Sequence, residues 1–423
     1  MSQSLEAGGD ARSVAEAVAR RSYGKLIAFL AARARDVSVA EDALSEAFTS
    51  ALADWPRTGC PSNPEGWLLT VARRRIIDRD RGLRRHELAA PDLKMLSPEL
   101  HTGMEITIPD QRLALMFTCA HPAIEASIRA PLMLQVVLGL DAKVIASSFL
   151  TSPTAMSKRL VRAKDKIRQA GIPFRIPDRD ELPGRIEAVL DAVYAAYTEG
   201  WTEAGGNDVV RRDLTEEAIF LARLVVEMLP EEAEALGLLA LILHAEARRR
   251  ARRDPEGEYV PFAEQDLAAW DWGGIEEAEG FLLRASTLGS IGRYQVEGAL
   301  QSAHVYRRRT GEANWAAVVQ LYDVLAAITG SPVVAINRAV AIAELSGAAA
   351  GLEAMRELSG DARIAEYQSY WAARADLLAR AGMRDEARAA YEMAIGLERD
   401  PAVRRFLQRR HASIHGTPGG AKS

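Results

Sequence analysis

The sequence predicts an all-α protein with more than one domain. Alanine, leucine, arginine and glutamate dominate, apolar residues recur at intervals of three and four, and alternating β-branched runs are scarce. The chain has 423 residues, of which 48% are hydrophobic and 26% are charged. This length and composition are typical of two or three packed domains and not of a disordered chain.

The sequence also indicates where the protein works. Its two cysteines, Cys60 and Cys119, lie far apart and give neither a disulfide framework nor a thiolate metal cluster, which favours a reducing compartment. The N-terminal segment lacks the apolar core of a signal peptide. The longest nearly apolar run, residues 130–140, is shorter than the roughly 20 residues that cross a bilayer. We therefore expect a cytoplasmic protein without membrane contact, metal or cofactor.

Charge is distributed unevenly along the chain. Residues 111–176 hold 10 Lys and Arg against 3 Asp and Glu, a net charge of +7. The net charge is −1 for residues 1–110 and −11 for residues 177–423. Because a concentrated basic surface attracts phosphates, a polyanion is expected to bind in the first half of the chain.

The first clear helical pattern begins at the segment SVAE. Ser38 is the expected N-cap, and Glu41 three residues later completes a capping box. The apolar stripe behind it predicts a buried face made of Ala43, Leu44, Ala47, Phe48, Ala51, Leu52 and Trp55. Three acids, Glu41, Asp42 and Glu46, remain on the other side of this helix.

A second helix is expected after a turn, with Asn63 as its cap and Pro64 in its first turn. Residues 73–85 of this helix contain seven arginines, against only two aspartates. A merely solvated helix usually intersperses acids to relieve such repulsion. The pattern therefore favours binding to a nucleic-acid strand whose bases stack on aromatic rings, although the preceding Trp67 fits a plain core position equally well.

Residues 111–176 predict a helix-turn-helix. A helix over residues 130–138 is followed by a short helix capped by Asp141, and Ser152 and Pro153 begin a third helix after a tight corner. In the third helix the apolar positions fall on one face, formed by Met156, Leu160, Ala163 and Ile167. Polar and basic side chains then point outward, as in a helix that enters the major groove. A solvated charged face is the alternative.

Residues 177–411 are interpreted as repeated helix pairs. The last pair follows the spacing of a tetratricopeptide repeat through Trp371, Ala375, Gly382, Ala387, Tyr391 and Ala394. Residues 412–423 are expected to form a disordered tail. Nothing in this half pairs a nucleophile with a base, so an enzyme is not expected. His121, near Cys119, is interpreted as structural because no further ligand lies at metal-binding spacing.

Four segments together resemble a known family. They are DVSVAEDALSEAFTSALADWP, NPEGWLLTVARRRIIDRDR, ALMFTCAHPAI and DAKVIASSFLTSPTAMSKRLVRAKDKIRQAGIPFRIP. The chain resembles bacterial extracytoplasmic-function sigma factors of the sigma-70 family, in the sub-group with a C-terminal tetratricopeptide-like extension. The resemblance implies region two over residues 1–90, a linker over 91–110, region four over 111–176 and the extension over 177–411.

The resemblance also implies roles for particular residues. The acidic face of region two, formed by Glu41, Asp42 and Glu46, would dock on the clamp helices of the largest subunit of core RNA polymerase. Promoter DNA would be bound at the minus-ten element by Arg73, Arg74, Asp78 and Arg79, and at the minus-thirty-five element by Ser157, Lys158, Arg159 and Arg162. The sequence departs from many relatives at Arg74, where they have Asn, and at Ala155, where they have Thr.

Two other interpretations remain open at this stage. The chain is alternatively a ligand-responsive helix-turn-helix regulator that acts without joining polymerase, which leaves the acidic face without a role. The extension is expected to contact the sigma regions within the chain, since its charge is opposite to that of region four. A general scaffold for another protein is the alternative for this half.

Overall fold

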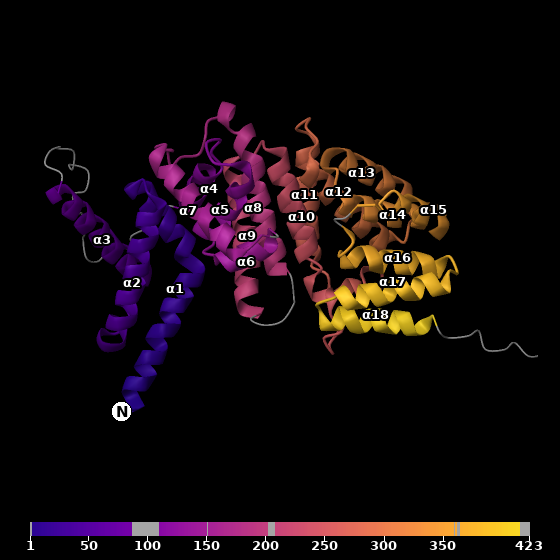
Figure 1. Ribbon diagram of the computed structural model, residues 1–423, viewed down its shortest axis with the longest axis horizontal. Helices are drawn as coiled ribbons and strands as arrows, with labels where there is room; N and C mark the ends of the chain where they lie inside the picture. The colour runs from indigo at the N-terminus through magenta and orange to yellow at the C-terminus, as the bar shows by residue number, and fades with distance from the viewer. Residues whose placement is uncertain are drawn as a thin grey trace, which may run out of the picture. The chain divides into compact units, whose positions relative to one another are not determined.

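The structure is a computed structural model, and it describes residues 2–86, 110–149, 151–201, 208–358, 360–361 and 364–414. Within these ranges the protein is all-α, as predicted, and the only β-type pairing is an isolated bridge between Arg253 and Tyr259 (Figure 1). The chain divides into two compact units. Unit 1 comprises Met1–Trp201 and Asp208–Leu221, and unit 2 comprises Thr202–Asn207 and Ala222–Ser423.

Unit 1 is built from short and long helices joined mostly by tight turns. Its helices are α1 (Ser2–Ala34), α2 (Val37–Thr58), α3 (Pro64–His86), α4 (Arg112–Cys119), α5 (Ala126–Val136), α6 (Ala142–Ser148), α7 (Pro153–Gln169), the 3-10 turn η1 (Arg179–Glu181), α8 (Pro183–Trp201) and the first part of α9 (Asp208–Met228). The predicted linker 91–110 lies, except for Asp110, outside the described residues.

Helices α1, α2 and α3 pack against one another in a three-helix group. Helix α1 was not predicted from the sequence, because its core residues 26–31 form a continuous apolar run that is buried all round and leaves no stripe. Trp67 meets Trp55 edge to face, with ring centroids 5.5 Å apart, so Trp67 belongs to the contact between α2 and α3. This geometry favours the core interpretation of Trp67.

Two local predictions for α2 were wrong. The cap is Asp36, whose carboxylate accepts a hydrogen bond from the Val39 N–H at 3.2 Å, and not Ser38. Leu52 is 50% exposed, because it lies at the edge of the stripe whose centre buries Leu44 and Trp55. The predicted cap of α3 is confirmed by a hydrogen bond from the Gly66 N–H to the Asn63 side chain at 2.9 Å.

Helices α4 to α8 pack around α5. The predicted caps Asp141 and Ser152 accept backbone hydrogen bonds at the starts of α6 and α7. The predicted apolar face of α7 is fully confirmed, since Met156, Leu160, Ala163 and Ile167 are all buried.

The boundary between the compact units differs from the boundary predicted at residue 177. Helix α8 packs on α5, and the Arg129 guanidinium donates to the Gly184 carbonyl at 3.4 Å. Arg112 of α4 is buried, pairs with Asp110 and with Glu217 of α9, and lies 4.2 Å from the ring centroid of Phe220. These contacts place α8 and the start of α9 in unit 1.

Unit 2 consists of helical hairpins. Its elements are the end of α9, α10 (Ala233–Glu246), η2 (Arg249–Arg252), η3 (Phe262–Glu264), η4 (Leu267–Ala269), α11 (Trp272–Ser286), α12 (Arg293–Thr310), α13 (Trp315–Thr329), α14 (Pro332–Ser346), α15 (Ala348–Arg356), α16 (Gln368–Arg380), α17 (Arg384–Leu397) and α18 (Pro401–Ser413). Helix α10 is apolar all round and packs against both α11 and α12.

The predicted crossing of α16 and α17 is observed. Ala375, Ala387 and Ala394 have no exposed surface, and Tyr391 joins the same cluster. Gly382 turns the chain between the two helices with a φ of +79°, in the left-handed region that glycine adopts readily. Helix α18 continues through Ser413, so the first two residues of the predicted tail are helical, and residues 415–423 lie outside the described residues.

An aromatic cluster surrounds Arg248 at the end of α10. The Arg248 guanidinium lies 4.8 Å from the Phe262 ring centroid and 5.9 Å from that of Trp270. His304 of α12 meets Phe262 and Trp315 edge to face. Burial, with smaller contributions from Arg307 and Arg248, lowers the pKa of His304 to about 4.

The low pKa of His304 predicts an acid-sensitive unit 2. Between about pH 6.5 and pH 4 the unfolded chain binds a proton at this residue that the folded chain does not, so stability falls as pH falls through this window. A shift of this size corresponds to about 3 kcal/mol. His304→Phe keeps a ring between Phe262 and Trp315 and should flatten the pH dependence of the free energy of unfolding by about that amount, measured by urea unfolding. Parallel profiles for the two proteins would contradict this assignment.

Candidate functional site

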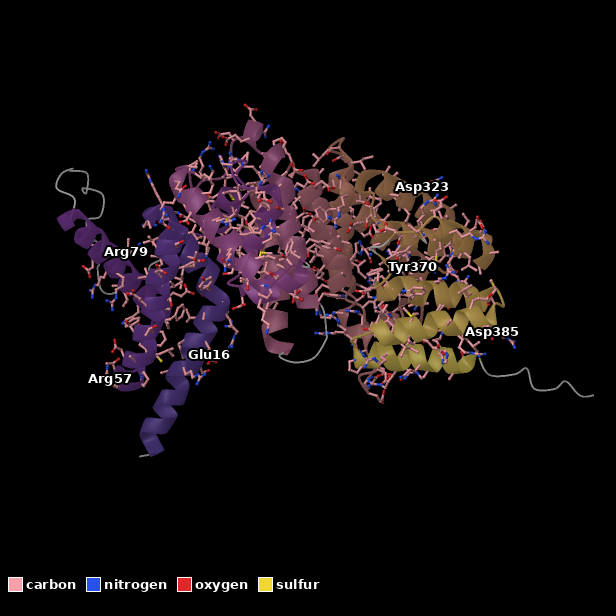
Figure 2. All side chains as sticks on the ribbon, viewed as in Figure 1. Glu16, Arg57, Arg79, Asp323, Tyr370 and Asp385 are labelled. Carbon is pink, nitrogen blue, oxygen red and sulfur yellow. The ribbon has the colours of Figure 1, made fainter. Side chains whose placement is uncertain are left out.

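The predicted polymerase-binding acids lie on α2, facing α3. Asp42 and Glu46 have side chains that are 66% and 58% exposed. Asp42 accepts a hydrogen bond from Arg79 at 3.2 Å, and Glu46 lies 3.3 Å from Arg75 (Arg79 is labelled in Figure 2). The structure thus brings two predicted polymerase contacts and one predicted DNA contact into a single charged surface. Exposed pairs of this kind are worth at most about 1 kcal/mol, so another partner can replace them readily.

Glu41 has different surroundings from its two neighbours. Its carboxylate lies 2.7 Å from the Lys164 ammonium of α7, and the two side chains are only 20% and 11% exposed. One turn further along α7, Arg168 lies 3.5 Å from Asp36, the cap of α2. These pairs join residues of predicted region two to the helix of predicted region four.

The backbones come close in the same contact. A Cβ added at Gly24 of α1 would lie 2.0 Å from the carbonyl oxygen of Val137, which ends α5, so only glycine fits there. Tyr23 packs beside Gly139, and burial, followed by the nearby Glu41, raises its pKa. Burial, again followed by Glu41, raises the pKa of the Cys119 thiol. We name the contact formed by Tyr23, Gly24, Glu41, Val137 and Lys164 the inter-region contact.

The predicted minus-ten residues divide into two kinds. Arg73 lies over the Phe29 ring, 4.7 Å from its centroid, and Arg33 lies 3.6 Å from the same centroid. This contact with Phe29 packs α3 on α1, and the burial that comes with it lowers the pKa of Arg73. Arg74 is exposed and has no ion-pair partner within the described part of the chain, and Asp78 is exposed on the same helix.

The predicted minus-thirty-five residues lie on α7. Ser157, Lys158 and Arg162 are exposed, as the sequence analysis expected. Arg159 instead reaches the start of α5, where its guanidinium donates to Ser127 and to Glu125, the latter at 3.3 Å. Three of the four side chains are therefore available to a partner in this conformation.

The ranges that the structure describes contain no group of three or more His, Cys, Asp and Glu residues that could hold a metal ion. The His121 Nδ1 atom accepts a hydrogen bond from the Ala123 N–H at 3.1 Å, which gives this histidine a structural role. Among the described helices, none has both the length and the apolar character needed to cross a membrane.

Comparisons with known proteins agree with the N-terminal part of this picture. Residues 18–86 match sigma-70 region 2, and residues 185–286 match a family of unknown function, DUF6596. Residues 18–86 are therefore a sigma-70 region 2. The chain is 36% identical over 381 residues to an uncharacterized protein of Rhizobium meliloti (strain 1021), and the match covers 88% of this chain and 89% of the relative, so these two proteins belong to one family. No solved structure matches the chain.

The inter-region contact can be tested through the two cysteines. Lys164→Ala leaves the Glu41 carboxylate without its cation in a largely buried position, which should cost about 1–3 kcal/mol and favour local opening. Cys119 is buried beside this pair, whereas Cys60 is exposed. The rate at which a thiol reagent labels Cys119 should rise about tenfold, and the rate at Cys60 should not change. Lys166→Ala, at an exposed position of the same helix, is the control, and an unchanged Cys119 rate in Lys164→Ala would contradict the prediction.

Proposed function

We propose that the protein is an RNA polymerase sigma factor of the extracytoplasmic-function type that directs promoter recognition. The match of residues 18–86 to sigma-70 region 2 carries this proposal, because region 2 implies binding to core polymerase and contact with promoter DNA. The basic net charge of residues 111–176 and the exposed Lys158 and Arg162 support a second DNA contact through α7. In this proposal the protein makes no phosphodiester bond itself, and core polymerase supplies that chemistry.

In this proposal, different residues of α2 and α3 bind polymerase and DNA. Asp42 and Glu46 exchange their arginine partners for the clamp helices of polymerase. This exchange frees Arg79, which together with Arg74 and Asp78 contacts the minus-ten strand. Arg73 does not contact the strand in this proposal. It packs on Phe29 of α1 and so holds α3 in place.

Helix α7 contacts the minus-thirty-five element through Ser157, Lys158 and Arg162, with Arg159 anchored on α5 until the complex forms. Glu41 is covered by Lys164 and becomes available only when the inter-region contact opens. The proposed sequence of events is therefore opening of unit 1, binding to polymerase, and then promoter melting.

Run-off transcription with purified core polymerase tests the polymerase contact. The double variant D42K/E46K reverses both acids and should lower promoter-specific transcript more than tenfold, since like charges across an interface cost several kcal/mol. Asp54→Lys on the same helix is the matched control, because the Asp54 side chain is 46% exposed and is also paired with an arginine, Arg57. Full activity of D42K/E46K would show that these two acids are not the polymerase contact. Specific binding of the wild-type protein to DNA without any promoter-specific transcript would instead support a helix-turn-helix regulator that acts without joining polymerase. The absence of any specific transcript from the wild-type protein across a genomic library would count against the proposal as a whole.

The DNA contact of α7 predicts a defined salt dependence. Lys158→Ala and Arg162→Ala should each lower the slope of log affinity against log salt for promoter binding by the holoenzyme by about 1, because each removes a phosphate contact. Arg356→Ala removes an exposed cation of α15 in unit 2 and should leave the slope unchanged. Equal slopes for all three variants would contradict the assignment.

We also propose that residues 177–411 regulate the sigma regions from within the chain. Their net charge is opposite to that of residues 111–176, and α8 packs directly on α5. Promoter binding with the same affinity and salt dependence for the full chain and for a chain ending after unit 1 would exclude masking by the remaining helices.

A further inference from the structure

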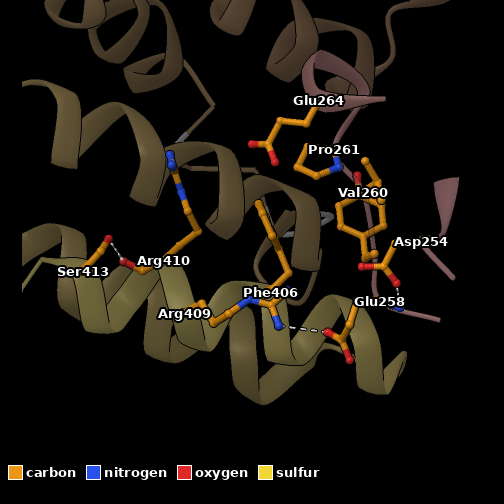
Figure 3. A pocket seen from close by; sticks show the side chains of 10 residues that line it. Asp254, Glu258, Val260, Pro261, Glu264, Phe406, Arg409, Arg410 and Ser413 are labelled. Atoms are coloured by element: carbon orange, nitrogen blue, oxygen red, sulfur yellow. Dashed lines mark hydrogen bonds and ion pairs between the residues drawn. The ribbon is translucent and has the colours of Figure 1, made fainter. Parts of the chain in front are cut away.

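Two pockets in unit 2 differ in how their charges are satisfied. The larger has a volume of about 510 Å³ and lies between the segment 254–264 and α18 (Figure 3). Its charges are largely paired within the protein, since Glu258 lies 2.6 Å from Arg405 and 2.9 Å from Arg409, and Arg410 lies 2.5 Å from Asp376. The ion pairs of Glu258 therefore hold the 254–264 segment on α18. Few charged groups of this pocket remain without a partner that a ligand could replace.

The second pocket has a volume of about 360 Å³ and lies between α11 and α12. Its charged groups are not satisfied in the same way. Glu276 on the α11 wall and Arg309 on the α12 wall have no ion-pair partner among the described residues, whereas the adjacent Glu277 pairs with Arg223 outside the pocket. Opposite charges therefore face the same space from its two walls.

The apolar part of this pocket includes two aromatic rings. The Trp272 indole N–H donates to the Leu267 carbonyl at 3.1 Å, which fixes the ring at the start of α11. Tyr306 contributes a second ring from α12. The volume falls within the range of about 300–1,000 Å³ that small-molecule sites occupy.

A buried histidine behind the pocket is a second and independent observation. His244 of α10 has no exposed surface, and neither of its ring nitrogens has a hydrogen-bond partner among the described residues. Its Nε2 atom lies 3.5 Å from Oε1 of Glu279, a pocket residue whose other oxygen accepts from the Ser302 hydroxyl at 2.9 Å. Burial lowers the pKa of His244 to about 4, so the ring is neutral at pH 7. Buried polar atoms without partners are rare in folded proteins, and each one requires a physical explanation.

We propose that this pocket binds a small zwitterion, a free α-amino acid. The ammonium group of the ligand is held by Glu276 and Glu279, its carboxylate by Arg309, and its side chain packs on the rings of Trp272 and Tyr306. Carboxylate-to-ammonium and guanidinium-to-carboxylate hydrogen bonds are the strong, charge-assisted kind. The inference concerns binding to unit 2, and it stands whether or not the sigma-factor proposal is correct.

Isothermal titration of the full-length protein with each of the common L-amino acids tests the proposal. At least one amino acid should bind. Glu276→Gln and Arg309→Gln should each lower the affinity for that amino acid by about tenfold or more, as expected for the loss of a charge-assisted hydrogen bond. Glu277→Gln on the same helix should bind like the wild type. The amine that lacks the ligand's carboxylate should bind the wild type and Arg309→Gln equally well, because it makes no contact with the guanidinium.

Failure of every amino acid to bind at millimolar concentration would overturn the proposal. Binding that is unchanged in both Glu276→Gln and Arg309→Gln would also overturn it, because the ligand would then occupy another place. Both substitutions are at exposed positions, and a thermal unfolding curve that matches the wild type shows that a loss of binding is not a loss of fold.

Discussion

Unit 1 depends on the close approach of α1 to the end of α5. At Gly24 the helix has no side chain, and the Val137 carbonyl fills the space that a Cβ would need. The close approach brings α2 within reach of α7, where the Glu41 carboxylate and the Lys164 ammonium are largely removed from water together. Charges withdrawn from water in this way must remain paired, because either one alone would be strongly unfavourable. Packing and charge therefore specify the same arrangement of these helices.

The two units use charge in different ways. In unit 1 the exposed acids of α2 are neutralised by arginines of α3, and Arg112 is neutralised inside by two carboxylates. In unit 2 most cations of the larger pocket are also paired, whereas Glu276 and Arg309 face the second pocket without an ion-pair partner among the described residues. These two groups are the ones that our proposal assigns to a ligand.

The features that the sequence predicted are those that act within one or two helical turns. The caps Asn63, Asp141 and Ser152 and the buried face of α7 follow from spacing alone, and the structure confirms them. The cap of α2 was misassigned by two residues, because Asp36 and Ser38 are both good caps and only the backbone conformation distinguishes them.

The features that the sequence did not predict depend on distant parts of the chain. Glu41 and Lys164 are 123 residues apart, and no periodicity connects them. The turning of Arg159 toward Glu125 and the packing of Arg73 on Phe29 depend on the same tertiary contacts. Helix α8 also looked like the start of the second half, because its apolar residues do not reveal which neighbour they bury against. The residue types of the candidate site were therefore predictable, but their availability to a partner was not.

The pair formed by Asp42 and Arg79 links two binding events through one bond. A protein partner that takes the acid releases the guanidinium, and a phosphate that takes the guanidinium releases the acid. Such coupling is reciprocal by thermodynamic necessity, so each partner raises the affinity for the other by the same factor. In the proposed function, the free protein would therefore bind DNA up to about fivefold more weakly than the protein whose acids are already bound by polymerase.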